Sequence, residues 1–505
     1  MKETVLPENL SGVHIHFVGI KGTGMAALAE IAAARGAVIT GSDVSEHFYT
    51  DEILERLGVH SLPFSAENVT PQTQLVVRSS AYSPEENPDL AEAERLGIPS
   101  MLYSEALGAL SRTAYSAGIC GVHGKTTTAG LVGAVLKETD LPAQVLAGSV
   151  MPAFGNSCVM TSEQFPAERG RRYFAAETCE YQRHFMAFSP KKIILTSVES
   201  DHQDYYPLFS DIQNAFIDYI CLLPEGGSLI FCADDPGAAQ TARLAAGRRP
   251  DIVLIPYGEV ADGAYRVSFG GAESGCQRFS LAAAGGCVLH VPGRHNVLNA
   301  AAAFALGCEL LKEDGRNPAD YYGRLKQGLA SFSGGKRRSE IVARKKNRFG
   351  NDIIFIDDYG HHPTAIRTTL AGYREFYSGC KIIVDFMSHT YTRTAALLEE
   401  FARSFSDADM VVINRIYASA RETASASAVT GEVLARRTQE CHRNAVYAGE
   451  FSGAADIIAA ELSKDAGPQF PGGYVFVTMG AGDNWKAGQL VLERLSSGEN
   501  REDKK

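Results

Sequence analysis

One glycine-rich segment combines the residue types that bind nucleotide phosphates: Gly121-Val122-His123-Gly124-Lys125-Thr126-Thr127. It lies between an apolar stretch at 114–120, which predicts a strand, and residues 126–137, which predict a helix. At such a turn, backbone N–H groups and the helix dipole bind phosphate oxygens, the lysine reaches the terminal phosphates, and a threonine hydroxyl can ligate Mg²⁺. The longer phosphate-loop pattern needs Gly at position 119, where this chain has Ile, so the loop is a shortened form. We predict a nucleotide site here in preference to a plain glycine turn with a surface lysine.

A second glycine-rich turn, Gly19-Ile20-Lys21-Gly22-Thr23-Gly24, follows the apolar stretch 13–20 and precedes a helical pattern at 25–36. Asp43 closes the next predicted strand about twenty residues further on, as in nucleotide-binding βαβ units. A dinucleotide fingerprint needs Gly at position 21, where this chain has Lys, so the pattern gives little support to nicotinamide binding. Two interpretations stay open: a helix N-terminus that approaches one diphosphate, or a turn that serves packing alone.

Carboxylates follow two further apolar stretches that predict strands. The segments are Ala176-Glu177-Thr178-Cys179-Glu180-Tyr181 and Glu199-Ser200-Asp201-His202-Gln203-Asp204. The carboxyl ends of parallel strands face the crevice where ligands bind, and carboxylates there can hold the Mg²⁺ that accompanies a nucleotide. Taken alone, these residues fit surface carboxylates equally well. The neighbouring phosphate loop favours metal ligands.

Polar residues also mark one predicted helix start and two strand ends in the second half of the chain. Gly293-Arg294-His295-Asn296-Val297-Leu298-Asn299 offers amide and imidazole groups that suit a purine edge, although helix-capping Asn residues are the simpler interpretation. Asp357-Asp358-Tyr359-Gly360-His361-His362-Pro363 and Ser388-His389-Thr390-Tyr391-Thr392-Arg393-Thr394 each follow an apolar strand, and we interpret both as contacts to substrate and phosphate. The adjacent His residues also raise a transition-metal site, which we favour less because no third ligand lies at helical or strand spacing.

The elements that must position these residues follow a pattern typical of parallel α/β layers, in which short apolar strands alternate with longer Ala- and Leu-rich helices. A βαβ pattern covers 13–43, a new unit opens at 114–120, and the composition changes again near 339. We therefore predict domain boundaries near 113 and 338. We also expect a β-ribbon excursion between 251 and 291 and a frayed tail at 496–505.

Length and charge limit the possible functions. The 505 residues are 45% hydrophobic and 21% charged, which gives room for about three domains of roughly 100–200 residues. The 48 Lys and Arg against 59 Asp and Glu give a net charge of −11, without the basic excess that nucleic-acid binding uses. The ten cysteines are scattered without C-x-x-C spacing, so we expect reduced thiols. We expect no signal peptide and no membrane insertion, because no apolar run approaches about 18 residues, and hence a cytoplasmic protein.

Taken in order, these motifs resemble those of the Mur ligase family. The matching segments are HFVGIKGTGM, GSD, SSAYSPEENP, GVHGKTTT, ETCEYQRHF, ESDHQDYY, PGRHNVLNA, GGKRRS, DDYGHHPT, SHTYTRT and GAGDNWK. So many motifs in one order make the resemblance specific. It implies an α/β protein of three domains: a Rossmann-like UDP-sugar-binding domain at 1–113, a central P-loop ATPase domain with a mostly parallel sheet at 114–338, and a Rossmann-like C-terminal domain at 339–505 that closes over the site and admits the amino acid.

The resemblance also implies roles for individual residues. The ATP-binding loop comprises Gly121, Val122, His123, Gly124, Lys125, Thr126 and Thr127, with Lys125 as a phosphate ligand. Thr126, Glu177 and His202 form the magnesium neighbourhood, His295, Asn296 and Asn299 contact adenine, Asp358 contacts the ribose, and His361 and Arg338 contact the phosphates. Tyr359, His389 and Arg393 surround the substrate carboxylate and the amino acid, and Gly22, Gly24, Ser42, Asp43 and Ser80 match the UDP-sugar site. The expected catalytic residues are Lys125, His361, His389 and Arg393.

Three positions depart from common family forms. Cys179 stands where many relatives carry an acid, Ser197 where Asn is frequent, and Ser339 where Phe is frequent. These changes leave the reaction class intact, but they leave the ligands of a second metal ion open. Lys191 and Lys192 lie too far from the matched motifs to be proposed as a modified catalytic lysine.

The activity that the resemblance implies is an ATP-dependent amide ligation in peptidoglycan precursor synthesis, with Mg²⁺ as cofactor. The lactyl carboxylate of UDP-N-acetylmuramate attacks the γ-phosphorus of ATP, and the amine of L-alanine then attacks the acyl phosphate. The expected partners are therefore ATP, UDP-N-acetylmuramate and L-alanine, with no nucleic acid. Two alternatives stay open: a ligase that attaches a preformed peptide to the same UDP-sugar or uses another acceptor, and a nucleotide-switch ATPase that forms no bond.

Overall fold

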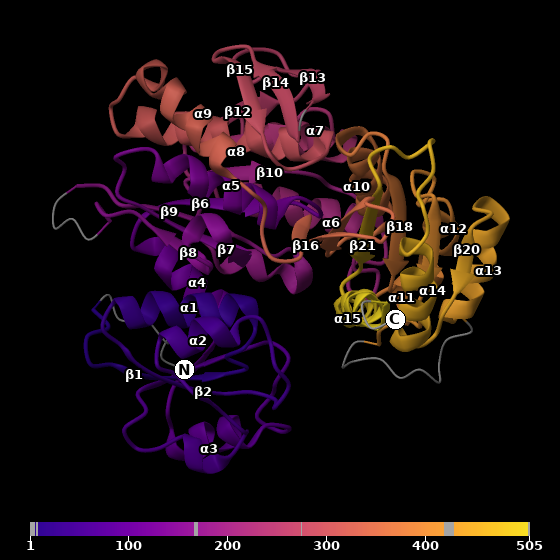
Figure 1. Ribbon diagram of the computed structural model, residues 1–505. Helices are drawn as coiled ribbons and strands as arrows, with labels where there is room; N and C mark the ends of the chain where they lie inside the picture. The colour runs from indigo at the N-terminus through magenta and orange to yellow at the C-terminus, as the bar shows by residue number, and fades with distance from the viewer. Residues whose placement is uncertain (1–5, 7–8, 166–169, 274, 419–428, 503–505) are drawn as a thin grey trace.

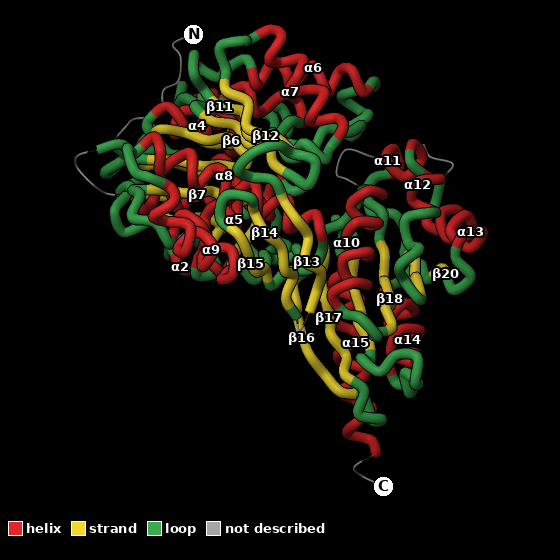
Figure 2. Tube along the Cα trace, turned by 90° about the horizontal axis from the view of Figure 1, so that it is seen from above, coloured by secondary structure: helices red, strands yellow, loops and turns green. Residues whose placement is uncertain are grey.

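The computed structural model describes residues 6, 9–165, 170–273, 275–418 and 429–502, and it contains three α/β lobes (Figure 1). The indigo N-terminal lobe and the central lobe lie one on the other, and the yellow C-terminal lobe lies beside them. The view from above again separates the C-terminal lobe, with β17 and β18, from the central lobe (Figure 2). Three of the sheets are wholly or mostly parallel, which confirms the predicted α/β class.

The N-terminal lobe is built on a parallel five-stranded sheet in the order β3-β2-β1-β4-β5. Its first unit is the predicted βαβ, in which a glycine turn connects β1 to α1. The elements are β1 (His14–Val18), α1 (Thr23–Ala34), β2 (Val38–Ser42), α2 (Asp51–Arg56), β3 (Ser61–Leu62), η1 (Ala66–Asn68), β4 (Leu75–Arg78), α3 (Pro88–Leu96), β5 (Ser100–Leu102) and α4 (Tyr103–Arg112).

The central lobe is built on a seven-stranded sheet in the order β12-β11-β10-β6-β9-β7-β8, with β8 antiparallel to β7. Its elements are β6 (Tyr115–Cys120), α5 (Lys125–Lys137), β7 (Ala143–Met151), η2 (Pro152–Phe154), β8 (Ser157–Thr161), β9 (Tyr173–Glu177), η3 (Tyr181–Ala187), β10 (Lys192–Leu195), α6 (Phe209–Ile220), β11 (Ser228–Cys232), α7 (Pro236–Arg248), β12 (Val253–Tyr257), β13 (Val267–Glu273), β14 (Cys276–Leu281), β15 (Gly285–Leu289), α8 (Arg294–Glu313), η4 (Pro318–Tyr321) and α9 (Tyr322–Ser331). The predicted β-ribbon is the antiparallel sheet β13-β14-β15, and it begins later than expected because β12 joins the main sheet.

The C-terminal lobe is built on a six-stranded sheet in the order β16-β17-β21-β18-β19-β20, with β16 antiparallel to β17. Its elements are β16 (Glu340–Lys346), β17 (Asp352–Asp358), α10 (Pro363–Phe376), β18 (Lys381–Phe386), α11 (Tyr391–Ala396), α12 (Leu398–Ala402), β19 (Met410–Ile413), α13 (Gly431–Cys441), β20 (Ala445–Tyr447), α14 (Phe451–Leu462), β21 (Tyr474–Met479) and α15 (Trp485–Glu502). The frayed tail predicted from 496 is wrong over 496–502, which continue α15, and 503–505 lie outside the described residues.

The three lobes are joined in two different ways. One apolar core runs through the N-terminal and central lobes and includes Leu107 and Phe185. A Cβ at Gly108 of α4 would lie 2.1 Å from the Ala187 carbonyl oxygen, so the backbones of these two lobes lie directly against each other there. The C-terminal lobe has its own cores on the two faces of its sheet. Because apolar packing joins the first two lobes continuously, the C-terminal lobe is the part that can move as a unit.

None of the helices that the structure describes is both long enough and apolar enough to cross a bilayer.

Candidate functional site

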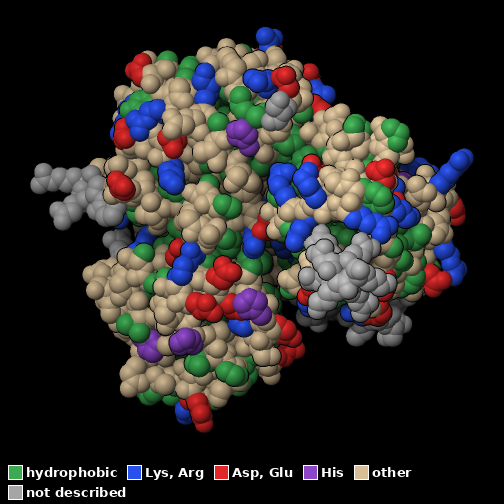
Figure 3. Space-filling model, viewed as in Figure 1, with side chains coloured by type: hydrophobic (Ala, Val, Ile, Leu, Met, Phe, Trp, Pro, Cys, Tyr) green, Lys and Arg blue, Asp and Glu red, His purple; other side chains and the backbone are tan. Residues whose placement is uncertain are grey.

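All three lobes line one cavity of about 620 Å³. Thr23 and Tyr49 come from the N-terminal lobe, the phosphate loop and the strand ends come from the central lobe, and Tyr359 and His361 come from the C-terminal lobe. Lys and Arg side chains gather where the C-terminal lobe meets the other two (Figure 3). The cavity therefore lies where the parallel strands of two sheets end, as expected for a ligand site in this fold class.

The phosphate loop adopts the expected strand-loop-helix geometry. Gly124 is the N-cap of α5 with a φ of 82°, and a Cβ there would lie 2.6 Å from the Asn299 side-chain oxygen. A glycine is required at this position for both reasons. Val122, His123, Gly124, Lys125, Thr126 and Thr127 line the cavity, whereas Gly121 lies just behind them with its own positive φ of 135°.

Lys125 folds back over its own loop. Its ammonium donates to the Gly121 carbonyl at 2.6 Å and to Glu180 at 3.1 Å. Burial opposes the charge on this lysine, but the Glu180 carboxylate outweighs it and raises the pKa of Lys125 above its ordinary value. Lys125 therefore stays cationic at the N-terminus of α5, and a cation at a helix N-terminus is suited to bind a terminal phosphate. The sequence pattern groups Glu180 with the strand-end carboxylates that suit a metal ion, and its position as the buried partner of Lys125 emerges only from the fold.

The predicted magnesium residues all line the same cavity. Glu177 accepts a hydrogen bond from the Gly148 N–H at 2.9 Å, which orients its carboxylate. His202 lies 3.5 Å from Glu180, and the Thr126 hydroxyl accepts from Arg338 at 3.4 Å. A hydroxyl and carboxylates beside a phosphate loop form an oxygen-rich donor set of the kind that Mg²⁺ takes.

The predicted adenine residues lie in the first turns of α8. Asn296 donates to the Pro292 carbonyl at 2.8 Å, and Asn299 donates to the Asn296 side-chain oxygen at 3.2 Å. The N-cap residue of α8 is Gly293, with no side-chain cap, so the simpler capping interpretation is wrong. Burial lowers the pKa of His295 to about 4, so its ring is neutral and can present one donor and one acceptor.

The start of the C-terminal lobe brings its charged residues to the cavity. Asp358 accepts from the backbone N–H groups of Ser339 and Gly360, both at 2.8 Å. The Arg338 guanidinium lies 4.7 Å from the ring centroid of Tyr359, a cation–π contact. The Ser339 hydroxyl lies 3.3 Å from the Asp358 carboxylate, so the small polar side chain at position 339 joins the hydrogen bonds around Asp358.

His361 is held in one tautomer. Its Nδ1 lies 2.9 Å from the Tyr359 carbonyl oxygen, which can only accept, so Nδ1 carries the proton. Burial, reinforced by the nearby Arg393, lowers the pKa of His361 well below its ordinary value. The neutral ring therefore has an unprotonated Nε2 that can accept a hydrogen bond, and the phosphate contact expected from the sequence stays a prediction.

Two predicted catalytic residues do not line the cavity. Arg393 is buried and ion-paired with Asp201 at 2.7 Å. His389 stacks on Tyr417 with ring centroids 5.7 Å apart and lies behind His361, at 6.2 Å between centroids. Both residues sit one layer behind the cavity wall in this arrangement of the lobes, so their contact with a substrate stays a prediction.

The predicted UDP-sugar residues lie in the N-terminal lobe and also outside the cavity wall. Gly22 is the N-cap of α1, and a Cβ at Gly24 would lie 2.6 Å from the Tyr103 ring. Asp43 accepts from the Lys21 and Val44 N–H groups at 2.7 and 2.8 Å, so it fixes the glycine turn. Ser80 is exposed, whereas Ser42 is buried with its hydroxyl 3.4 Å from His16.

Comparison with known proteins matches each lobe to a family model. Residues 14–115 match the Mur ligase family catalytic domain, 119–307 match the Mur ligase middle domain, and 337–482 match the Mur ligase glutamate ligase domain. The three matches follow one another along most of the chain.

Whole-chain relatives agree with these matches. The chain is 48% identical to the UDP-N-acetylmuramate–L-alanine ligase of Treponema pallidum over 97% of this chain and 98% of that protein. The fold is similar to the crystal structures of the UDP-N-acetylmuramate-alanine ligase of Thermotoga maritima (TM-score 0.73, 24% identity, 96% of this chain and 99% of that one) and of a murein peptide ligase of Psychrobacter arcticus (TM-score 0.65, 22% identity, 96% and 99%). These matches confirm the resemblance that the motifs indicate. The chain therefore belongs to the Mur ligase family.

Proposed function

We propose that this protein is an ATP-dependent ligase that joins L-alanine to the lactyl carboxylate of UDP-N-acetylmuramate in peptidoglycan precursor synthesis, with ADP and phosphate as products. The observation that carries the proposal is the cavity in which the Lys125 loop is joined by Arg338, Tyr359 and His361 from the C-terminal side. The relative at 48% identity, which bears the name of this reaction, supports the choice of substrates.

Each lobe has a part in this proposal. Residues 1–113 bind the UDP-sugar, 114–338 bind ATP, and 339–505 bind the amino acid and close over the site. The separate core of the C-terminal lobe supports this division, because a lobe with its own core can open and close as a unit.

In the first step, a carboxylate oxygen bonds to the γ-phosphorus of ATP while the bond from that phosphorus to the ADP oxygen breaks. The product is an acyl phosphate. The protein's task is to hold and neutralise charge, because little covalent chemistry is asked of it. Lys125 and Arg338 are two of the cationic residues that line the cavity, and we assign this role to them.

In the second step, the amine of L-alanine bonds to the acyl carbon, phosphate leaves, and the amine loses a proton. The unprotonated Nε2 of His361 can accept a hydrogen bond from the amine N–H, so we choose this residue to orient the attacking amine, whose proton passes to the departing phosphate. Tyr359 lines the cavity beside His361 and orients the amine. His389 lies behind His361, outside the cavity wall, and supports the position of its ring.

The proposed reaction uses Mg²⁺ with its nucleotide. Thr126 and Glu177 would hold the ion with His202, and the hydroxyl and carboxylate oxygens fit it. When bound, it supplies positive charge that balances the phosphates. ATP and the UDP-sugar are cytoplasmic metabolites, so we also propose a cytoplasmic location.

Phosphate release from ATP tests the proposal. With UDP-N-acetylmuramate present, sustained release should require L-alanine, and the product should be the UDP-sugar carrying one alanine. The similarity of the fold to both an alanine ligase and a peptide ligase makes a tripeptide the necessary second acceptor. Turnover with the tripeptide and not with alanine would replace the proposal by a peptide ligase. Turnover with ATP alone would replace it by a switch ATPase.

A further inference from the structure

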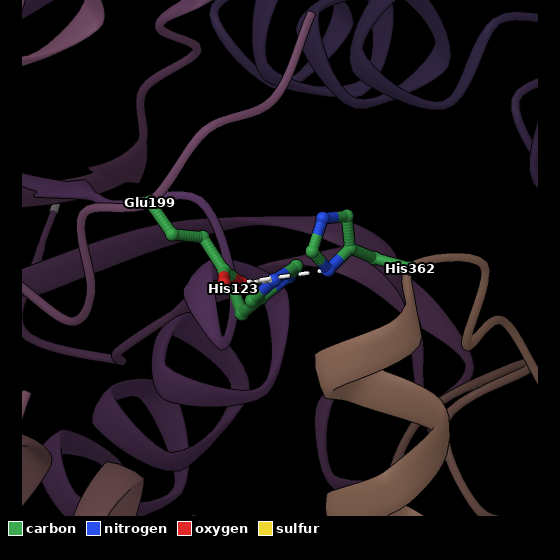
Figure 4. A group of neighbouring side chains, drawn as sticks. All are labelled: His123, Glu199 and His362. Carbon is green, nitrogen blue, oxygen red and sulfur yellow. Dashed lines mark ion pairs between the residues drawn. The ribbon is translucent and has the colours of Figure 1, made fainter. Parts of the chain in front are cut away.

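Three side chains from separate segments meet beside the phosphate loop (Figure 4). His123 belongs to the loop before α5, Glu199 follows β10, and His362 precedes α10 of the C-terminal lobe. One donor atom from each lies within 4.8 Å of the others. His362 Nδ1 is 3.5 Å from Glu199 Oε1, and His123 Nε2 contacts the same carboxylate oxygen. No residue at nearby sequence spacing offers a third metal ligand to the adjacent His361 and His362. The fold instead brings two ligands of the central lobe, His123 and Glu199, to His362.

We propose that His123, Glu199 and His362 form a binding site for a divalent transition-metal ion, with Zn²⁺ as the best match, at the junction of the central and C-terminal lobes. This site is separate from the nucleotide's magnesium neighbourhood, and its test does not depend on the ligase reaction.

The donor set selects the class of metal. Two imidazole nitrogens and one carboxylate oxygen suit Zn²⁺, with a fourth position left for water, whereas Mg²⁺ takes oxygen ligands. Bonds of about 2.1 Å in a tetrahedron place two ligand atoms about 3.4 Å apart. The 3.5 Å between His362 Nδ1 and Glu199 Oε1 matches that separation, whereas His123 Nε2 lies closer to the same oxygen and would move away from it to share an ion.

Neighbouring groups hold the three side chains in place. The His123 N–H donates to the Ser197 hydroxyl at 2.9 Å, which fixes the loop from behind. The other Glu199 oxygen accepts from the Thr364 hydroxyl at 3.1 Å, which orients the carboxylate. Such outer contacts set the direction of metal ligands in proteins. His362 Nδ1 also accepts a long 3.3 Å bond from the Thr364 N–H, and this is the contact that an ion would replace.

Burial gives the cluster both rigidity and access. The side chain of His362 is 6% exposed, whereas those of His123 and Glu199 are 24% and 30% exposed toward the cavity that they line. An ion could therefore enter from the cavity. Once bound, it would tie the start of α10 to the phosphate loop and oppose opening of the C-terminal lobe.

The test is metal binding by the full chain without nucleotide. Cobalt titration should give the visible bands of a tetrahedral ion at one equivalent; Zn²⁺ should remove these bands, and excess Mg²⁺ should not. His362→Asn keeps an N-cap residue for α10, and Glu199→Gln keeps the Thr364 contact. Each should weaken Zn²⁺ binding at least about tenfold, as measured by competition with a chromophoric chelator.

Two matched controls separate this site from other donors. His290→Asn removes an exposed imidazole 3.5 Å from Cys276, and His202→Asn removes the imidazole of the magnesium neighbourhood. Both should keep the cobalt bands and the zinc affinity. The proposal is overturned if His362→Asn and Glu199→Gln, shown by circular dichroism to be folded, bind zinc like the parent chain. Weak octahedral cobalt bands, or a loss confined to His202→Asn, overturn it as well. If zinc binds as expected but no alanine is ligated, the proposed function alone fails.

Discussion

Arg393 and Asp201 form a buried ion pair that joins the C-terminal lobe to the central lobe. The Arg393 Nε and Nη2 atoms donate to one oxygen of Asp201 at 3.2 and 2.7 Å, and the residues are 8% and 4% exposed. Asp201 precedes His202, which lines the cavity. The pair therefore connects the position of the C-terminal lobe to the proposed magnesium neighbourhood.

We expect Asp201→Asn to destabilise the protein by about 3–5 kcal/mol, because removing one partner leaves the other charge buried without compensation. Urea unfolding followed by circular dichroism measures this. Glu399→Gln, which breaks the exposed Arg437 pair, is the control and should leave the midpoint unchanged. Equal midpoints for Asp201→Asn and the parent chain would mean that the lobes are apart in solution.

The Arg393–Asp201 ion pair also predicts how the free energy of unfolding changes at low pH. Burial opposes the charge on Asp201, but Arg393 outweighs it and lowers the pKa of Asp201 below 3.8. A lowered carboxyl pKa stabilises the folded state above the ordinary pKa, and this contribution is lost as pH falls through the folded value. The difference in unfolding free energy between parent and Asp201→Asn should therefore be constant from neutral pH to about pH 4 and shrink below it. A difference that shrinks already between pH 7 and 5 would contradict this assignment.

Lys125→Ala should reduce ATP-dependent product formation by at least about 10²-fold, because a buried cation at the transferring phosphate is lost. Lys137→Ala at the other end of α5 is the control; its ammonium only reaches the Ala153 carbonyl at 3.3 Å on the exposed surface. Product formation is measured by separating the UDP-sugar from its alanine adduct. Near-normal product formation by the Lys125→Ala variant would contradict the role of the phosphate loop in the reaction.

Gly124→Ala should lower ATP affinity at least about tenfold and destabilise the chain by about 1–3 kcal/mol, because the loop must adopt a positive φ. The added Cβ would also lie 2.6 Å from the Asn299 oxygen, in the proposed adenine site. Gly247→Ala in α7 is the matched control, since nothing lies within 4 Å of its Cβ position. Calorimetric ATP titration and thermal melting measure both effects. If both variants bind ATP equally well, Asn299 does not sit beside the nucleotide.

The sequence carries the local parts of this site and misses the pairs that tertiary contacts create. The glycine loop, the βαβ at 13–43 and the strand-end carboxylates are short-range patterns, because alternation and turn chemistry fix them within a few residues. Arg393 and Asp201 are 192 positions apart, so no local pattern joins them. His123 and His362 are also far apart in the sequence, so only the fold brings them together. The capping interpretation of Asn296 fails because Gly293 begins α8 and leaves the amide free to bond Pro292.

Asp385 predicts a pH dependence of stability that has nothing to do with the cavity. It is fully buried at the end of β18, where burial raises its pKa to about 7. Asn414 donates to its Oδ1 at 2.8 Å, whereas its Oδ2 has no hydrogen-bond partner among the described residues. A raised carboxyl pKa means that the folded state holds a proton that the unfolded state releases above its ordinary pKa.

Stability should therefore fall as pH rises from about 4 to about 7, and the cost from this one group amounts to about 4 kcal/mol at most. Asp385→Asn should remove that slope, because the amide does not titrate and its NH₂ group can donate to the buried Asn484 oxygen, which is unpartnered in the described structure. The measurement is the unfolding free energy of both chains at pH 5 and pH 8, with exposed Asp465→Asn as the control. Between pH 5 and pH 8 the unfolding free energy of the variant should therefore rise relative to that of the parent. Parallel profiles for the two chains would show that Asp385 is ionised and solvated in the folded protein.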